Sequence, residues 1–74
     1  MKLVAIYVEG YNRGALGRCW KVLGITPEGK IGAVPKDFWY YDEAIEEAKR
    51  LSKKYKTKII RPSNIQTELK RLLR

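Results

Sequence analysis

The sequence contains no histidine and a single cysteine, Cys19, and these scarcities exclude several kinds of site. One cysteine cannot form a disulfide within the chain, and the usual ligands are too few for a zinc site. A serine or cysteine nucleophile activated by histidine is also excluded, since the base is missing. We therefore expect Cys19 to fill the core, and we expect neither a metal nor a cofactor.

Long apolar runs are lacking as well. The longest run, Leu3–Val8, has six residues. A membrane-spanning helix needs about 20 apolar residues, and a signal peptide also needs a longer apolar segment than this one. We therefore expect no membrane partner and an intracellular, cytoplasmic chain.

Several thermolabile residue types are scarce too. The chain has one glutamine, two asparagines and one methionine, while lysine, glutamate, arginine, isoleucine and tyrosine are plentiful. This bias is typical of proteins from thermophiles. Because no motif of high specificity is present, a virus or plasmid of a thermophile is one source that we consider.

Basic residues, in contrast, are in excess. The 74 residues include 16 lysines and arginines against 8 acids, a net charge of +8, and 45% of the chain is hydrophobic. That apolar content argues for a folded chain, and the length suits one domain, residues 1–74. Residues 48–74 hold ten bases and one acid, Glu68. Such a local excess of positive charge attracts polyanions.

Apolar patterning and turn residues predict three strands in the first half of the chain. Residues 1–9 predict a strand, and because its segment Leu3–Val8 is apolar on both faces, we expect it to be central in the sheet. Residues 10–17 hold three glycines, whose G-x3-G-x2-G spacing predicts a loop and matches no nucleotide-binding motif. Residues 18–26 and 30–34 predict a hairpin around the turn Thr26–Gly29, which has proline at its second position.

The second half of the chain predicts two helices and a short strand. Asp42 suits the N-cap of a helix that runs to Tyr55, with acids near its start and bases near its end. Residues 57–61 predict a strand. Ser63 and Gln66 predict a capping box at the start of the last helix. The apolar stripe of that helix consists of Ile65, Leu69, Leu72 and Leu73.

Together these elements predict an α+β fold with the order β-β-β-α-β-α. We expect a four-stranded mixed or antiparallel sheet of order 3-2-1-4, packed with two helices. The fourth strand should lie parallel to the first, because a strand that follows a helix returns by a right-handed crossover. The first helix should cover one face of the sheet. The last helix could cover the rest of that face, the other face, or a partner chain.

The favoured hypothesis is a small basic nucleic-acid-binding protein that contacts DNA or RNA mainly through phosphates, with little sequence specificity. Exposed aromatic rings could stack on the bases. The candidate phosphate-binding residues are Arg13, Arg18, Lys49, Arg50, Lys53, Lys54, Lys56 and Lys58, and the candidate stacking residues are Tyr11, Trp39 and Tyr40. Some of these bases have a simpler explanation, since they stabilise the end of a helix and Arg50 can pair with Glu46.

Two other interpretations stay open. The aromatic run 38–41 and the last helix also suit a protein-interaction or homo-oligomeric accessory protein, although Phe38 or Trp39 is expected to fill the core. In that case a homodimer would form through Ile65, Leu69, Leu72 and Leu73. An enzyme is not expected. A small metal-dependent nuclease would need carboxylates brought together in space, and the candidates are Glu9, Asp37, Asp42 and Glu43.

The segment from Arg18 to Ser52 is similar in outline to small DNA-binding domains in which a three-stranded sheet precedes a helix, such as integrase arm-binding domains. The likeness lies in Trp20 within a strand, the turn at Pro27–Gly29 and the helix opening at residues 42–44. In those domains the sheet lies in the major groove, so the resemblance implies DNA binding through the sheet. The chain departs from them at Pro35, in its aromatic insert and in its further strand and helix, and no site residue is carried over.

Overall fold

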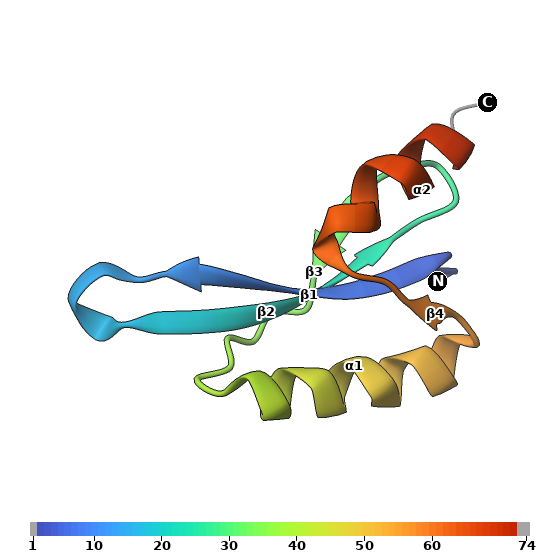
Figure 1. Cartoon of the computed structure of the whole chain (residues 1–74). Helices are drawn as coiled ribbons and strands as arrows, with labels where there is room; N and C mark the ends of the chain where they lie inside the picture. Colours follow the sequence, from blue (N-terminus) through green and yellow to red (C-terminus); the bar gives the residue numbers. More distant parts are fainter. Residues whose placement is uncertain (1, 73–74) are drawn as a thin grey trace.

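The computed structural model describes residues 2–72, with every side chain in that range except that of Leu16. A four-stranded sheet lies between two helices, one on each face (Figure 1). The order β3-β2-β1-β4 confirms the predicted α+β fold and strand order. The elements are β1 (Ala5–Asn12), β2 (Arg18–Ile25), β3 (Ile31–Ala33), α1 (Tyr41–Tyr55), β4 (Lys58–Ile59) and α2 (Ile65–Leu72), with 3-10 turns at Gly14–Leu16 and Pro62–Asn64.

Strand β1 lies inside the sheet and pairs on both sides. It runs antiparallel to β2 over its whole length, from the pair Ala5–Ile25 to the pair Asn12–Arg18. On its other side it runs parallel to β4, where Ile6 pairs with Ile59. A parallel neighbour requires a crossover connection, and α1 lies in that crossover. The predicted parallel pairing of the first and fourth strands is therefore confirmed.

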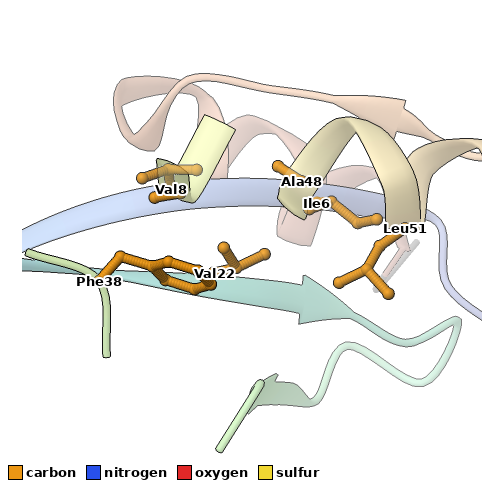
Figure 2. Packing of buried hydrophobic residues seen from close by; sticks show 7 residues of the cluster. Ile6, Val8, Val22, Phe38, Ala48 and Leu51 are labelled. Atoms are coloured by element: carbon orange, nitrogen blue, oxygen red, sulfur yellow. The ribbon is translucent and has the colours of Figure 1, made fainter. Parts of the chain in front are cut away.

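Burial on both faces explains why the first half of β1 is apolar throughout. Ile6 and Val8 face α1, while Ala5 and Tyr7 face α2, and all four are at most 7% exposed. Directly paired residues of antiparallel strands share a face, so β2 divides its side chains in the same way. Figure 2 shows the core beneath α1, where Ile6 and Val8 lie with Val22, Phe38, Ala48 and Leu51.

Of the two aromatic residues expected to fill the core before α1, Phe38 does so and Trp39 does not. Phe38 forms an isolated bridge with Trp20 of β2, through backbone hydrogen bonds of 2.8 and 2.9 Å. Its side chain is 5% exposed, whereas Trp39 is 50% exposed. Neighbouring residues of an extended segment point to opposite sides, so this run cannot bury every ring.

The loop predicted at residues 10–17 is shorter than expected, because β1 continues through Gly10 to Asn12. The turn itself spans Arg13–Gly17, where two glycines have φ values of 65° and 90° that favour glycine. At Gly10, glycine is needed for a different reason, the close approach of another side chain. The guanidinium group of Arg18 lies across it, and a Cβ at this position would come within 2.8 Å of Arg18 Nε. The glycines therefore mark both a turn and a close approach within the hairpin.

Both predicted helix caps are wrong. Helix α1 begins at Tyr41 with Tyr40 as its N-cap, and no side chain caps it. Asp42 lies one residue inside the helix, where it still faces the positive end of the dipole. Ser63 lies inside the 3-10 turn that precedes α2, so it does not occupy a helix cap. In both places the helical turn starts earlier than the polar residue that was expected to cap it.

Two buried alanines, Ala44 and Ala48, allow α1 to approach the sheet closely. We expect Ala48→Leu to push the helix outward and to lower the free energy of unfolding by about 1–3 kcal/mol. Glu46→Leu adds a leucine at an exposed position of the same helix and should change it by less than about 0.5 kcal/mol. Chemical denaturation measures both, and equal losses would contradict the packing of α1 on this face.

Candidate nucleic-acid interface

The structure distributes the eight predicted phosphate-binding residues over three places and does not gather them into one surface. Arg13 and Arg18 lie at the far end of the β1–β2 hairpin, which extends beyond both helices (Figure 1). Lys58 lies on β4 and reaches toward α2. The second half of α1 and the residue that follows it hold Lys49, Arg50, Lys53, Lys54 and Lys56.

At the hairpin, the two arginines are already engaged. Arg13 Nη1 lies 3.3 Å from Asp37 Oδ2. The guanidinium carbon of Arg18 lies 5.8 Å from the ring centre of Trp20, and Tyr41 meets that indole edge-on with ring centres 6.2 Å apart. Arg18 is therefore part of a small cation–aromatic cluster beside the start of α1.

Tyr11, a predicted stacking residue, is only partly accessible. Its hydroxyl oxygen is buried and has no hydrogen-bond partner in the described range. Burial, with a contribution from nearby Asp37, raises the pKa of Tyr11. The ammonium group of Lys21 lies 5.1 Å from its ring centre. This ring is therefore already covered by a cation within the hairpin.

The other predicted stacking residues are exposed but lie far from the lysines. Trp39 and Tyr40 are 50% and 68% exposed beside the start of α1, and their neighbour Tyr41, which is not one of the predicted stacking residues, is 51% exposed. Helix α1 has 15 residues, so its two ends are about 20 Å apart. The aromatic end also carries Asp42 and Glu43, which do not favour a polyanion. The structure thus separates the exposed aromatic rings from the basic end of the helix.

Charge changes sign along α1, and its middle turns are neutralised locally. Arg50 donates two hydrogen bonds, of 2.6 and 2.9 Å, to Glu47. This interaction holds the pKa of Glu47 below its usual range. Lys49 Nζ lies 4.0 Å from Glu46, so the expected pairing of Arg50 with Glu46 is wrong. The bidentate geometry favours the acid three residues before Arg50.

The last turn of α1 and the residue that follows it hold three bases without acidic partners. Lys53, Lys54 and Lys56 are exposed, and none forms an ion pair with any residue between 2 and 72. Lys53 lies on the side of the helix next to β4, since both line the same groove. Lys54 lies on the other side, with its ammonium group 5.6 Å from the ring centre of Tyr55.

Lys56 ends the helix in an unusual conformation. Its φ and ψ are 51° and 52°, and within residues 2–72 no other non-glycine residue has a positive φ. Its backbone amide donates to the Ser52 carbonyl and closes the helix. Glycine is preferred at this position, and another residue there costs roughly 1–2 kcal/mol. Sequence patterning missed this feature because a lysine gives no signal of a left-handed turn.

A shallow groove runs between α1 and the edge strand β4. Its volume is about 420 Å³, and Lys49 and Lys53, one helical turn apart, line it together with Ile59. Ile59 is 38% exposed on this edge. Ser52 also lines the groove, and its hydroxyl donates to the Thr57 carbonyl, which links the end of α1 to the start of β4.

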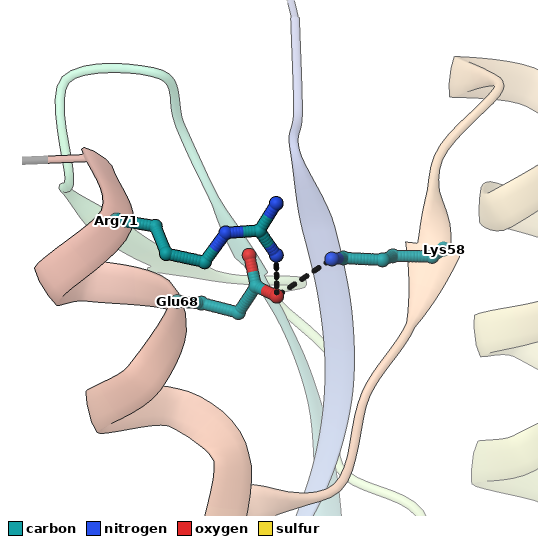
Figure 3. Close-up of polar contacts among 3 residues, drawn as sticks. All are labelled: Lys58, Glu68 and Arg71. Carbon is teal, nitrogen blue, oxygen red and sulfur yellow. Dashed lines mark hydrogen bonds and ion pairs between the residues drawn. The ribbon is translucent and has the colours of Figure 1, made fainter.

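Lys58 has a role within the fold. Its Nζ lies 2.6 Å from Glu68 Oε1, and Arg71 Nη1 lies 3.3 Å from the same oxygen (Figure 3). Glu68 is buried on α2, at 9% exposure. The three side chains therefore join α2 to β4, and the charge of Lys58 is largely neutralised there.

The apolar stripe of α2 packs within the chain. Ile65, Leu69 and Leu72 are partly buried against the cluster formed by Ala5, Tyr7 and Ile25, on the face opposite α1. Leu73, the fourth member predicted for a dimer interface, lies outside the described residues. Of the positions left open for the last helix, the structure shows the second face of the sheet. This face is the one that the resemblance to sheet-binding domains would offer to DNA, and α2 covers one end of it.

The described part of the chain shows no metal centre. No three cysteine or carboxylate side chains between residues 2 and 72 lie close enough together to hold an ion. Glu9, Asp37 and Asp42, which a nuclease would need together, form no such group. Neither described helix has the length and apolar character needed to cross a membrane.

Comparisons with known proteins add no functional assignment. No protein-family model, no curated protein and no solved structure matches the chain.

The ion-pair cluster on α2 predicts acid-sensitive stability. The hydrogen bond from Lys58 outweighs partial burial and holds the pKa of Glu68 below its usual value of 4.5. The ionised Glu68 side chain therefore stabilises the folded protein fully above pH 4.5. This stabilisation is lost as the pH falls through the lower pKa that Glu68 has in the folded protein. Glu68→Gln should therefore unfold more easily than the parent at pH 7, with a difference that shrinks toward pH 3. Thermal unfolding across this range tests it, and a pH-independent difference would contradict it.

Proposed function

We propose that the protein binds nucleic acid through its phosphate backbone, on a lysine surface formed by Lys49, Lys53 and Lys56. The observation that carries the proposal is the charge arrangement of α1. Lys53 and Lys56 lie without acidic partners at one end of the helix, while the acids gather in its first half. Lys49 and Lys53 line a groove that a sugar-phosphate chain can follow.

Helix stability alone does not account for this surface. Carbonyl groups at the end of a helix attract cations, which explains a lysine such as Lys53 in the last turn. Lys56, however, follows the last turn and occupies a conformation in which glycine would be more stable. A lysine at this position is less stable than a glycine would be. This supports a role for its charge in binding and not in stabilising the fold.

The expected binding is weakly selective among sequences. Lysine ammonium groups act as point charges on phosphates, and three of them displace about three counterions. Arg50, which could read a base edge through two parallel bonds, uses that geometry on Glu47. The exposed aromatic residues lie at the other end of α1, so base stacking there would need a strand that spans the helix.

The first test is the salt dependence of binding to labelled single- and double-stranded DNA and RNA, measured by fluorescence anisotropy. The logarithm of affinity should fall linearly with the logarithm of salt, and Lys53→Gln/Lys56→Gln should reduce the slope by about 1.4–1.8. Lys21→Gln/Lys70→Gln removes two charges elsewhere and should leave the slope unchanged. If the two double variants reduced the salt slope equally, binding would depend on net charge alone and not on the lysine surface. A flat salt response of the parent would reject the proposal.

Lys56 allows a second test in which stability and binding change in opposite directions. Lys56→Gly should raise the free energy of unfolding by about 1 kcal/mol, because it relieves the left-handed conformation. It should also reduce the salt slope by about 0.7–0.9, because one phosphate contact is lost. Lys56→Gln keeps the strain and should show only the change in slope. Lys56→Gly binding as well as the parent would exclude this residue from the interface.

A second candidate function is a protein-interaction surface at the start of α1. Three consecutive aromatic side chains, Trp39–Tyr41, are each at least half exposed there, beside the cluster of Arg18 and Trp20. Exposed aromatic groups of this kind are common at protein interfaces. This candidate becomes the stronger one if the parent shows no binding to nucleic acid at low salt.

A further inference from the structure

A second groove, separate from the lysine surface, lies between β3 and the second half of α1. It has a volume of about 310 Å³, within the range of small-molecule sites. Its walls are almost entirely apolar, with Leu3, Val22, Val34 and Leu51 among them. Of its lining residues, only Thr26 and Tyr55 carry a polar group on the side chain; Thr26 directly follows β2, and Tyr55 is the last residue of α1.

The groove is open because two glycines face each other across the strands. Gly24 of β2 pairs with Gly32 of β3, so this part of the sheet has no side chain on the face toward α1. Leu3 occupies the space above Gly24, where a Cβ would lie 3.0 Å from one of its methyl groups. At Gly32, in contrast, a Cβ would meet no atom within 4 Å, and φ is not positive.

Neither packing nor backbone conformation therefore requires glycine at position 32. Glycine within a strand lowers stability, and a β-branched residue here would both favour the strand and cover apolar surface. Because Gly32 has no side chain, the groove stays open above this part of the sheet. When an apolar group enters such an open apolar groove, both surfaces are removed from water, and this favours binding.

Positive charge lies at one end of the groove. The ammonium group of Lys54 lies 5.6 Å from the ring centre of Tyr55, which forms part of the wall. Thr26, on the groove wall, is held by the Lys30 backbone, whose carbonyl accepts from the Thr26 amide at 2.9 Å and whose amide donates to Thr26 Oγ1 at 3.1 Å. Glu47 accepts two hydrogen bonds from Arg50, which lower its pKa with a smaller contribution from the charge of Lys54.

We propose that this groove binds a single-chain anionic amphiphile, with its alkyl chain along the apolar walls and its carboxylate near Lys54. The apolar walls exclude a wholly polar ligand, and the ammonium group of Lys54 favours an anionic head group over a neutral one. This site is independent of the proposed nucleic-acid surface, which uses residues on the other side of α1.

Dodecanoate, used below its micellar concentration, is a suitable probe, and isothermal titration calorimetry measures its binding to the intact chain. Gly32→Val places two methyl groups in the groove and should weaken binding at least tenfold while the protein becomes no less stable. Ile31→Val changes the same strand on the opposite face and should bind as the parent does. Circular dichroism in the same samples confirms that the probe does not unfold the chain.

The head group is tested by comparing dodecanoate with dodecanol. The parent should prefer dodecanoate, and Lys54→Gln should reduce that preference about fivefold while leaving dodecanol unaffected. Undiminished binding to Gly32→Val, or equal affinity of the parent for the two probes, would overturn the proposal. Because Gly32→Val keeps Lys49, Lys53 and Lys56, its affinity for nucleic acid should equal that of the parent, whichever result the amphiphile gives.

Discussion

The burial of β1 on both faces is the constraint on which the rest of the fold depends. An apolar strand of this kind needs cover on both sides, and α1 and α2 supply it on one face each. Each helix must present a narrow apolar face, which leaves its remaining surface to charged residues. The proposed lysine surface is therefore a consequence of the same arrangement that builds the core.

The distribution of acids separates structural bases from free ones. Glu47 engages Arg50, Glu68 engages Lys58 and Arg71, Asp37 engages Arg13, and Glu46 lies 4.0 Å from Lys49. Five bases between residues 2 and 72 form ion pairs, and the other described bases form none. The free lysines at the end of α1 lie between two grooves, the one beside β4 and the apolar one beside β3. The same helix thus supplies positive charge to two surfaces of different chemistry.

The strand order could be predicted from the sequence because it follows from two strong signals. The unbroken run Leu3–Val8 marks the inner strand, and the helix before residues 57–61 requires a parallel return. Helix starts were predicted less well, since Asp42 and Ser63 are good caps that the backbone does not use. Capping propensity states what a residue can do, but here α1 begins at Tyr41, three residues after the bridge of Phe38 to Trp20, and uses no side-chain cap.

The candidate site was harder to predict because its selectivity depends on partners distant in the sequence. Lys58 meets Glu68 ten residues away, and this contact removes it from the free bases. The left-handed conformation of Lys56 has no sequence signal, and the openness at Gly32 depends on how β3 lies beside α1. The apolar stripe of α2 likewise indicated that this helix packs against an apolar surface. It did not indicate whether that surface is a face of its own sheet or a second chain.

The placement of β4 also bears on how the chain assembles. Strands β1, β2 and β3 are joined by short turns, so their pairing is local and is expected to form early. Strand β4 has only two residues, and Ile59 pairs with Ile6, more than fifty positions earlier in the chain. Closing so long a loop for so few hydrogen bonds is unfavourable until α1 has packed. The face under α2 is therefore expected to be the last part of the core to become dry.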